Sequence, residues 1–535
     1  MLDMMVTCRV AAIFCVSITA VLGRSAPEPL SISPSFSWDG ADGRWSSFNI
    51  QVGTPPQLLR VLPSTSANAG SAPWVIIDPG CSKVNPSLEK CADLRGGLFE
   101  SNRSSSWSTE GLENGVDGVI YNLPADEELQ IGRDGNGSYG YDTVGLGIPG
   151  SGLPSLQHQL VAGVWDDKYF VGSLGLSPLP TNFSNLQDPQ SSVLGALVNQ
   201  SLVPSSSWAY TAGAYYRDVF GSLIFGGYDE TRFQTNNQTF AFDSMVSRDL
   251  TVSLRSITYD TAGASPLLTS SVDIFIDSLV TEIWLPIETC NAFQQQFNLT
   301  WNPQGQLYLV DEVAHAALVA QNPSFTFTIG QSGSDSGATV DIVLPYAAFD
   351  QVLSEPIVSN TTRWFPIKQA QNASQLFLGR TFLQEAYVIA DYDRRTFSVS
   401  QALFPDSSVK QRLTAIHRPP SEGDAGTHIT TAKLAGLIAL AVVVSVLCVV
   451  ALLWCLRRSR KMSRENEGGT TNVKELSSSS ASHCEVDASE YQIYEVDTRQ
   501  RMPELQNGEY FYRHELETRE VAQELHGSSA RFSGQ

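Results

Sequence analysis

Short runs in which apolar and polar residues alternate fill the chain between residues 47 and 403. The segments DLTVSLRSITYD at 249–260 and SFTFTIG at 324–330 are examples, and Gly, Pro, Asn and Ser separate such runs from one another. A period of two residues places successive side chains on opposite faces of a strand. The pattern therefore predicts an all-β region, and its roughly 355 residues are enough for two cores of ordinary domain size.

Two uninterrupted apolar runs flank this region. The first, residues 10–22, follows Arg9 and precedes small residues, which is typical of a secretory signal peptide over 1–25. The second, residues 434–456, carries no charge and is long enough to cross a bilayer as a helix. Arginines follow it directly from Arg457, and positive residues mark the cytoplasmic side of a membrane. We therefore expect a single-pass type I membrane protein at the cell surface or in an endomembrane or vacuole.

The segments outside the alternating region are polar. Residues 26–46 form a short N-terminal segment, and residues 404–433 are expected to be a stalk before the membrane. Residues 457–535 contain a serine run and few apolar clusters, which predicts a disordered cytoplasmic tail. Its tyrosines, Tyr491 and Tyr494, are candidate contacts for a cytoplasmic kinase or adaptor, and a solvated linker is the alternative.

N-glycosylation sequons give independent support for this topology. All of them precede residue 434, and they lie at Asn102, Asn136, Asn182, Asn199, Asn237, Asn298, Asn360 and Asn372. Glycosylation on one side only is what a type I orientation predicts. We therefore expect a glycoprotein.

Charge and residue spacing exclude several functions. The formal net charge is −21, whereas a nucleic-acid-binding domain presents a basic face. No pair of histidines has the spacing of a metal site on a helix, so no metal and no cofactor are expected.

Two sequence elements share one design. Residues 48–75, NIQVGTPPQLLRVLPSTSANAGSAPWVI, and residues 273–286, DIFIDSLVTEIWLP, each read as a strand, a turn and a second strand. These elements resemble those that deliver the two catalytic aspartates in pepsin-like aspartic peptidases. Further segments of 47–403 resemble the same family in the same order, including the turns at Gly175 and Gly379. The resemblance implies two β-rich lobes around a cleft, an N-terminal lobe over 47–225 and a C-terminal lobe over 226–403.

The resemblance also places the catalytic positions. Asp277 keeps its carboxylate, but the interval from the Gly-Thr-Pro turn puts Ser64 where the first aspartate belongs. Such an enzyme needs two carboxylates that share a proton across a bound water, one as base and the other as acid. A serine hydroxyl does not accept that proton, so Ser64 is expected to be inactive. Asp277 is then expected to have no like-charge neighbour that perturbs its pKa.

Other departures from the family surround these positions. Ser66 and Leu279 replace the glycines of the two motifs, whereas Thr65 and Ser278 keep the hydroxyls that bond across the lobe interface in the family. Counting back without gaps from Gly140 places Gln130 at the position of the flap tyrosine, and Tyr121 fits there only if the loop length differs.

Two routes to retained activity stay open. Asp78 or another acid could replace Ser64, although Asp78 lies beyond Trp74. Ser64 could act as a nucleophile, but this needs an adjacent base such as histidine, and the histidines lie outside the recognised motifs. A serine that hydrogen-bonds Asp277 is the simpler interpretation.

Three cysteines are expected on the oxidising side of the membrane: Cys81, Cys91 and Cys290. The resemblance pairs Cys81 with Cys91 in a small disulfide loop. Cys290 is either a buried free thiol or an intermolecular link.

Three hypotheses follow for function. The first is a catalytically impaired protein that binds a peptide or protein ligand in its cleft, acts as a sensor and signals through its tail. The second is an active aspartic-type endopeptidase, and the third is a structural surface glycoprotein. The missing carboxylate favours the first, because loss of one member of a catalytic unit costs orders of magnitude in rate.

Overall fold

The computed structural model describes residues 26–67, 72–84, 88–112, 119–181, 189–260, 266–334, 336–406 and 408–420, together with Val449, Val450, Leu453, Trp454 and Arg457. The chain divides into two compact units, residues 1–428 and 429–535. No helix among the described residues combines the length and apolarity needed to cross a membrane. The predicted signal peptide and almost all of the predicted span 434–456 and tail 457–535 lie outside the described residues.

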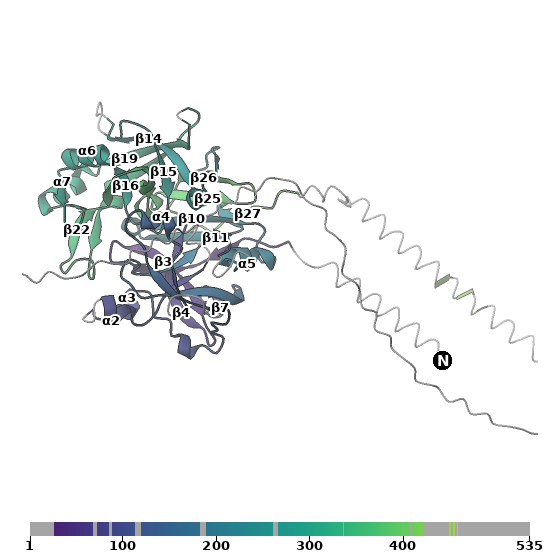
Figure 1. Cartoon of the computed structure of the whole chain (residues 1–535). Coiled ribbons are helices and arrows are strands. Elements are labelled where there is room, and N and C mark those ends of the chain that lie inside the picture. Colours follow the sequence, from purple (N-terminus) through teal and green to yellow (C-terminus); the bar gives the residue numbers. More distant parts are fainter. Residues whose placement is uncertain are drawn as a thin grey trace, which may run out of the picture. The chain divides into compact units, whose positions relative to one another are not determined.

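The N-terminal lobe is built on a sheet with the strand order β2-β3-β4-β9-β5-β8-β7-β6. Its strands are β2 (Pro34–Asp39), β3 (Trp45–Val52), β4 (Gln57–Ser64), β5 (Trp74–Ile76), β6 (Ile120–Asn122), β7 (Asn136–Leu146), β8 (Ser155–Val164) and β9 (Gly172–Gly175). In Figure 1, β3, β4 and β7 are the purple and blue strands of this lobe.

The C-terminal lobe has a second sheet with the order β20-β19-β14-β15-β24-β16-β23. Its strands are β14 (Thr251–Tyr259), β15 (Val272–Ile276), β16 (Ile283–Pro286), β19 (Ser324–Gln331), β20 (Val340–Pro345), β23 (Ile367–Ala370) and β24 (Phe377–Leu378). The predicted alternation is visible in β19, where Phe325, Phe327 and Ile329 are buried and the threonines between them are only half-buried. This lobe contains the teal strands β14, β15, β16 and β19 in Figure 1.

A third sheet joins segments from both halves of the chain in the order β1-β11-β10-β25-β26-β13. These strands are β1 (Leu30–Ile32), β10 (Ser207–Ala214), β11 (Val219–Phe225), β13 (Phe240–Ala241), β25 (Ala386–Asp391) and β26 (Thr396–Gln401). Two smaller sheets comprise β17 (Thr300–Asn302), β18 (Leu307–Leu309), β22 (Thr362–Phe365) and β21 (Gln351–Leu353), and β12 (Gly227–Asp229) with β27 (Leu413–Ala415).

The α-helices in the described part of this unit are short and lie between strands. They are α2 (Gly80–Val84), α3 (Cys91–Leu94), α4 (Asp126–Leu129), α5 (Val193–Asn199), α6 (Ile287–Phe297), α7 (Glu312–Gln321), α8 (Tyr346–Phe349) and α9 (Arg380–Leu383). Strands therefore carry the architecture, which confirms the predicted all-β, pepsin-like class of fold.

The folded unit extends past residues 47–403 at both ends. β1 and β2 lie within the short N-terminal segment 26–46, and β1 pairs with β11. β27 lies within the segment predicted to be a stalk and pairs with β12. Both ends of the described region are therefore tied into sheets by backbone hydrogen bonds.

One local arrangement occurs in both lobes. β4 pairs in parallel with β9, β9 pairs antiparallel with β5, and β5 pairs in parallel with β8. In the C-terminal lobe β15, β24, β16 and β23 repeat these directions. The two sequence elements that share one design therefore fold in the same way.

Candidate functional site

Ser64 and Asp277 occupy equivalent positions in the two repeated arrangements. Ser64 ends β4 in register with Gly175. Asp277 follows β15 directly, and its backbone N–H donates to the carbonyl oxygen of Leu378 at 3.1 Å. Gly379, next to Leu378, has no room for a side chain, because a Cβ there would lie 2.3 Å from the Glu282 carbonyl oxygen. Ser64 and Asp277 are both completely buried.

Hydroxyl groups bind the two catalytic-type loops together. The Thr65 backbone N–H donates to Ser278 Oγ and the Ser278 N–H donates to Thr65 Oγ1, both at 2.9 Å. Ser278 Oγ also donates to the Pro63 carbonyl oxygen at 2.7 Å. The cross-lobe hydroxyl exchange that the sequence implied is therefore present. The hydrogen bond expected from Ser64 to Asp277 is not formed, because the buried Ser64 Oγ has no hydrogen-bond partner among the described residues.

Asp277 does have an acidic neighbour, and this corrects the expectation that it stands alone. Glu128, in α4 of the hairpin between β6 and β7, lies within hydrogen-bonding reach of Asp277 and is completely buried. The Leu279 N–H donates to Asp277 Oδ1 at 2.9 Å. Asp277 Oδ2 and both carboxyl oxygens of Glu128 are buried without a hydrogen-bond donor from the described part of the chain, so a proton on Glu128 would satisfy Asp277 Oδ2.

Burial favours a single negative charge on the two carboxyl groups. Burial and the negative charge of Asp277 raise the pKa of Glu128 well above its usual value, so Glu128 is the protonated partner. Burial also raises the pKa of Asp277, while bonds from the Leu279 N–H and from Glu128 lower it. Arg133 and Arg380 favour the charged form of Asp277, and Tyr169 also faces the pair. The result is a carboxylic acid that donates to a carboxylate.

The hairpin that carries Glu128 is attached to the C-terminal lobe at several points. Glu127 forms a buried ion pair with Arg248, with 2.9 Å between Oε2 and Nη1. The Gln375 side chain donates to the Gln130 carbonyl oxygen at 2.6 Å, so Gln130 contacts the other lobe through its backbone. Tyr121 donates its hydroxyl to the Leu112 carbonyl oxygen at 2.5 Å. The Glu127 and Gln130 contacts hold the hairpin across the cleft and over Asp277, whereas the Tyr121 contact lies within the N-terminal lobe.

Leu279 fills the space beneath this hairpin. Although Leu279 belongs to the C-terminal lobe, it is buried in an apolar cluster of the N-terminal lobe that includes Leu123, Trp74 and Tyr139. Trp74 also meets Tyr169 edge to face, with 4.8 Å between ring centroids. The side chain that replaces the motif glycine is therefore an anchor between lobes, and it occupies room that an open cleft would leave free.

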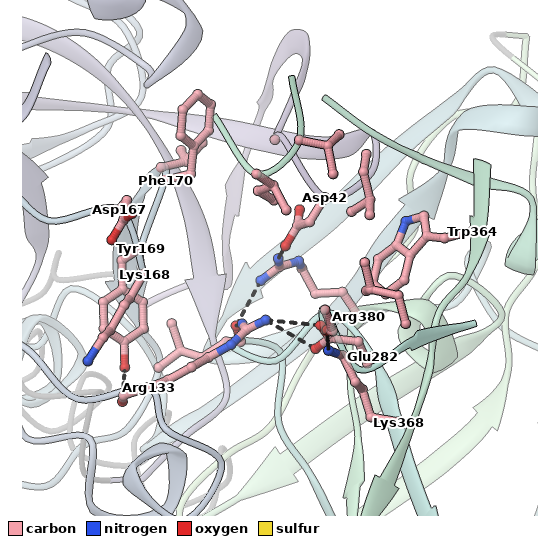
Figure 2. Close-up of a pocket in the computed structure, with 18 of the residues that line it drawn as sticks. Asp42, Arg133, Asp167, Lys168, Tyr169, Phe170, Glu282, Trp364, Lys368 and Arg380 are labelled. Atoms are coloured by element: carbon pink, nitrogen blue, oxygen red, sulfur yellow. Dashed lines mark hydrogen bonds and ion pairs between the residues drawn. The ribbon is translucent and has the colours of Figure 1, made fainter. Parts of the chain in front are cut away.

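A pocket of about 510 Å³ lies between the lobes beside these residues. Figure 2 shows Arg133, Glu282, Lys368 and Arg380 gathered on one side of it. Arg133 Nη2 and Glu282 Oε2 are 3.1 Å apart, and Arg133 also donates to the Leu279 carbonyl oxygen at 3.1 Å. Arg380 donates to the carbonyl oxygens of Ser278 and Leu279 and pairs with Asp42 at 3.2 Å. Guanidinium groups therefore hold the loop after Asp277 from two sides.

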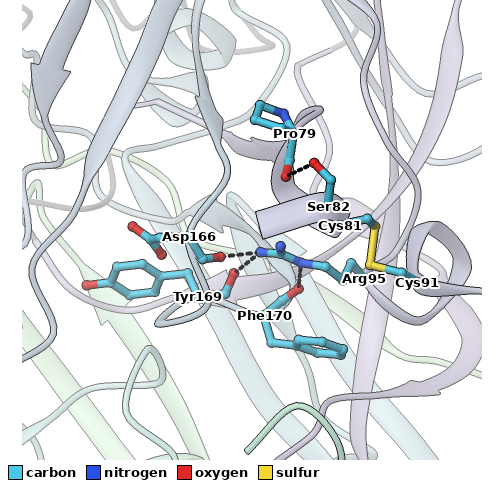
Figure 3. The surroundings of a disulfide bond; sticks show 8 residues. All are labelled: Pro79, Cys81, Ser82, Cys91, Arg95, Asp166, Tyr169 and Phe170. Atoms are coloured by element: carbon cyan, nitrogen blue, oxygen red, sulfur yellow. Dashed lines mark hydrogen bonds between the residues drawn. A yellow bond between two sulfur atoms is a disulfide. The ribbon is translucent and has the colours of Figure 1, made fainter. Parts of the chain in front are cut away.

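The disulfide predicted between Cys81 and Cys91 is present and supports one wall of this pocket. Arg95 follows α3 and is completely buried below the disulfide (Figure 3). Its guanidinium donates to the carbonyl oxygens of Asp166, Tyr169 and Phe170 at 2.6–3.0 Å. Burial lowers the pKa of Arg95 to about 10. The disulfide loop thus positions residues 166–170, several of which line the pocket.

The remaining predicted residues lie away from the site. Asp78 is exposed in the turn before α2. His158 stacks on Tyr141, and His315 lies 3.0 Å from Asp350, so neither activates Ser64. Where the structure describes a sequon asparagine, that residue is exposed, as N-glycosylation requires, and Asn182 lies outside the described residues.

Cys290 is a buried free thiol, which resolves the alternative that the sequence left open. It is completely buried against β23 and donates to the Lys368 carbonyl oxygen at 3.2 Å. Burial raises its pKa to about 12. An intermolecular disulfide would require this thiol to leave the core.

Sequence reasoning missed Glu128, Arg133 and Arg380. A signal for the first was present, since Asp126, Glu127 and Glu128 form an acidic run in the loop expected to cover the cleft. That Glu128 meets Asp277 depends on how the hairpin folds back onto the other lobe. The spacing of the motifs does not specify this fold of the hairpin.

Comparison with known proteins agrees with this geometry. Residues 47–402 match the family model described as eukaryotic aspartyl protease. Candidapepsin from Candida tropicalis is 25% identical over 364 residues, which cover 67% of this chain and 79% of the relative. Secreted aspartic protease 8 from Candida albicans is 26% identical over 67% of this chain and 76% of its own length. Aspartic proteinase yapsin-3 from Saccharomyces cerevisiae is 24% identical over 73% and 74%, respectively. The chain belongs to the eukaryotic aspartyl protease family.

Proposed function

We propose that this chain is a catalytically silent member of its family that binds a peptide or protein ligand between its lobes without hydrolysing it. One observation carries the proposal. At the position where hydrolysis takes place in the family, Ser64 supplies a hydroxyl, and Glu128 covers the remaining carboxylate, Asp277. All three side chains are completely buried, so neither a water nor a scissile peptide reaches Asp277 in this conformation.

The chemistry of the Glu128 and Asp277 carboxyl groups also supports the absence of peptide hydrolysis. Hydrolysis requires a base that takes a proton from water and an acid that gives one to the carbonyl oxygen, with the water held between them. Here the Glu128 carboxyl group lies directly against Asp277, which leaves no gap for a water between the two groups in this conformation. Leu279 adds an apolar side chain to the same space.

We further propose that the domain is displayed outside a membrane, at the cell surface or in an endomembrane compartment. The leader-like run at 1–25, the apolar run at 434–456 and the arginines after it support this topology. The exposed sequons and the disulfide are compatible with an oxidising, glycosylating compartment. In this topology the tail 457–535 faces a cytoplasmic adaptor or kinase.

A second candidate function rests on the same carboxyl pair. Two carboxyl groups that share a proton are the chemical core of an aspartic peptidase. If the hairpin moved so that a water entered between them, Glu128 would replace the aspartate missing at position 64. The second candidate is therefore an aspartic-type endopeptidase in which Glu128 acts as the second acid.

Peptide cleavage decides between the two. The full-length protein is incubated with a pool of quenched fluorescent peptides from pH 3 to pH 7, with and without pepstatin. The silent protein gives no pepstatin-sensitive cleavage. Turnover that disappears in Glu128→Gln, while the unfolding transition is retained, would establish the second candidate and refute the first.

A gain-of-activity variant serves as the positive control. Ser64→Asp with Ser66→Gly and Leu279→Gly restores the motif, and Glu128→Ala is added because the Glu128 carboxyl lies against Asp277. Pepstatin-sensitive cleavage in the fourfold variant but not in the wild type shows that the scaffold supports catalysis once the site is open. The threefold variant, which retains Glu128, is expected to stay inactive.

A further inference from the structure

The pocket between the lobes contains an uneven set of buried and half-buried charges. Arg133, Lys368 and Arg380 contribute three positive charges, and Asp42 and Glu282 contribute two negative charges. Glu282 pairs with Arg133 and Asp42 pairs with Arg380. These five lining groups carry one net positive charge, and the Asp277 carboxylate, which interacts with Arg133 and Arg380, offsets it without facing Lys368.

Lys368 is the cation without a carboxylate of its own. Within the described residues no acidic oxygen lies at ion-pair distance from its Nζ, which donates to the Gly305 carbonyl oxygen at 3.1 Å. Its ammonium group also lies 5.9 Å from the centre of the Trp284 ring. Burial lowers the pKa of Lys368, because Glu282 offsets only part of the cost of removing the ammonium from water. Lys368 is half-buried, and an ammonium in such a place with unused N–H donors is suited to an anionic group from outside.

The rest of the lining defines what else the ligand carries. Apolar side chains from both lobes surround the cations: Leu62, Phe170, Val171, Leu307, Leu353 and Trp364. At the rim, Lys168 pairs with Asp134, and Asp167 is exposed beside it. Both guanidinium groups are already engaged by carboxylates and backbone carbonyls, so the bidentate contact that favours a phosphate is not free. The lining suits a single carboxylate on an apolar body.

We propose that this pocket binds a peptide through an acidic side chain flanked by apolar residues, with its carboxylate on Lys368. The proposal rests on the proposed function, since it identifies the ligand class of the same cleft. Arg133 and Arg380 position the wall around the ammonium, and the apolar side chains take the neighbouring residues of the peptide. Figure 2 shows Lys368 beside Glu282, with the Trp364 ring at the same side of the pocket.

Binding of three matched probes tests this assignment. The peptides are fluorescein-labelled Leu-Leu-X-Leu-Leu sequences with X as Glu, Gln or phosphoserine, and anisotropy is measured with the full-length protein. We expect the Glu peptide to bind about tenfold more tightly than the Gln peptide, the gain typical of a charge-assisted hydrogen bond. In Lys368→Met the two affinities become equal, and the Gln peptide binds as it does to the wild type. In the matched control Lys410→Met, which removes an exposed lysine that does not line this pocket, the preference for Glu is retained.

Three outcomes would overturn the assignment of Lys368 as the carboxylate-binding residue. Equal binding of the Glu and Gln peptides, or a preference that Lys368→Met leaves unchanged, overturns it, and tighter binding of the phosphoserine peptide replaces the carboxylate by a phosphate. Absence of binding by all three peptides also overturns it. Cleavage of a bound peptide, detected by mass spectrometry, would instead refute the proposal that the protein is catalytically silent. The measured preference for Glu over Gln would still decide whether Lys368 binds the carboxylate. Thermal unfolding of each variant shows whether its fold is retained.

Discussion

Glu128→Gln tests the proton shared between Glu128 and Asp277. The amide has the shape of a protonated glutamic acid and still donates a hydrogen bond to Asp277, but it does not ionise. We therefore expect Glu128→Gln to be about as stable as the wild type near pH 4 and increasingly more stable than the wild type at higher pH.

The sign and size of this effect follow from linkage. The pKa of Glu128 is about 4.3 in the unfolded chain and well above that in the folded protein. Its contribution to the free energy of unfolding is therefore fully present below about pH 4.3 and is lost as the pH rises towards the folded pKa. In that window the wild type loses about 1.4 kcal/mol per pH unit relative to the variant, because the folded state holds one proton that the unfolded state has released.

Urea unfolding of both proteins from pH 4 to pH 8, followed by tryptophan fluorescence, measures this difference directly. Groups that titrate alike in both proteins cancel when one curve is subtracted from the other. Glu128→Ala is the matched control, since it also removes the titration but leaves Asp277 without its donor, which costs about 1–3 kcal/mol. A difference between wild type and Glu128→Gln that does not change with pH would refute the shared proton, as would a Gln variant no more stable than the Ala variant.

Three further substitutions test the packing of the site, each by urea unfolding. Leu279→Gly is expected to cost about 3 kcal/mol or more, because it removes a buried side chain between the lobes, and to speed amide exchange in residues 123–135; unchanged exchange would show that Leu279 does not hold the hairpin. Ser278→Ala is expected to cost about 1–3 kcal/mol through the lost bonds to Thr65 and the neighbouring loop, and a neutral result would contradict the cross-lobe exchange. Gly379→Ala is expected to cost about 2 kcal/mol, because its Cβ would meet the Glu282 carbonyl oxygen at 2.3 Å; wild-type stability would mean that the loop yields without strain.

The parts of the site that depend on local sequence could be predicted. Strand, turn and hydroxyl positions recur at fixed intervals, so Ser64 and Asp277 could be aligned and the bonds between Thr65 and Ser278 anticipated. The disulfide between Cys81 and Cys91 followed from the same spacing. The class of fold also followed, because period-two patterns specify strands wherever one face is buried.

The rest depends on contacts between segments far apart in the chain. Glu128 and Asp277 are separated by almost the whole of one lobe, and nothing near either residue specifies the other. The role of Arg133 could not be predicted from the sequence either, since its carboxylate partner, Glu282, comes from the opposite lobe. A buried acid is stable only where its surroundings supply a proton or a cation, and only the assembled fold shows what they supply.

Leu279 has a consequence for how this chain differs from peptidases. A leucine in a turn built for glycine is tolerated because the covering hairpin gives it an apolar environment, and the hairpin in turn rests on that leucine. The leucine at position 279 is favourable only while the hairpin covers it, and the closed hairpin is favourable only while the leucine is present. Reversal of either one alone passes through a less stable protein, so the leucine and the closed hairpin are expected to change together.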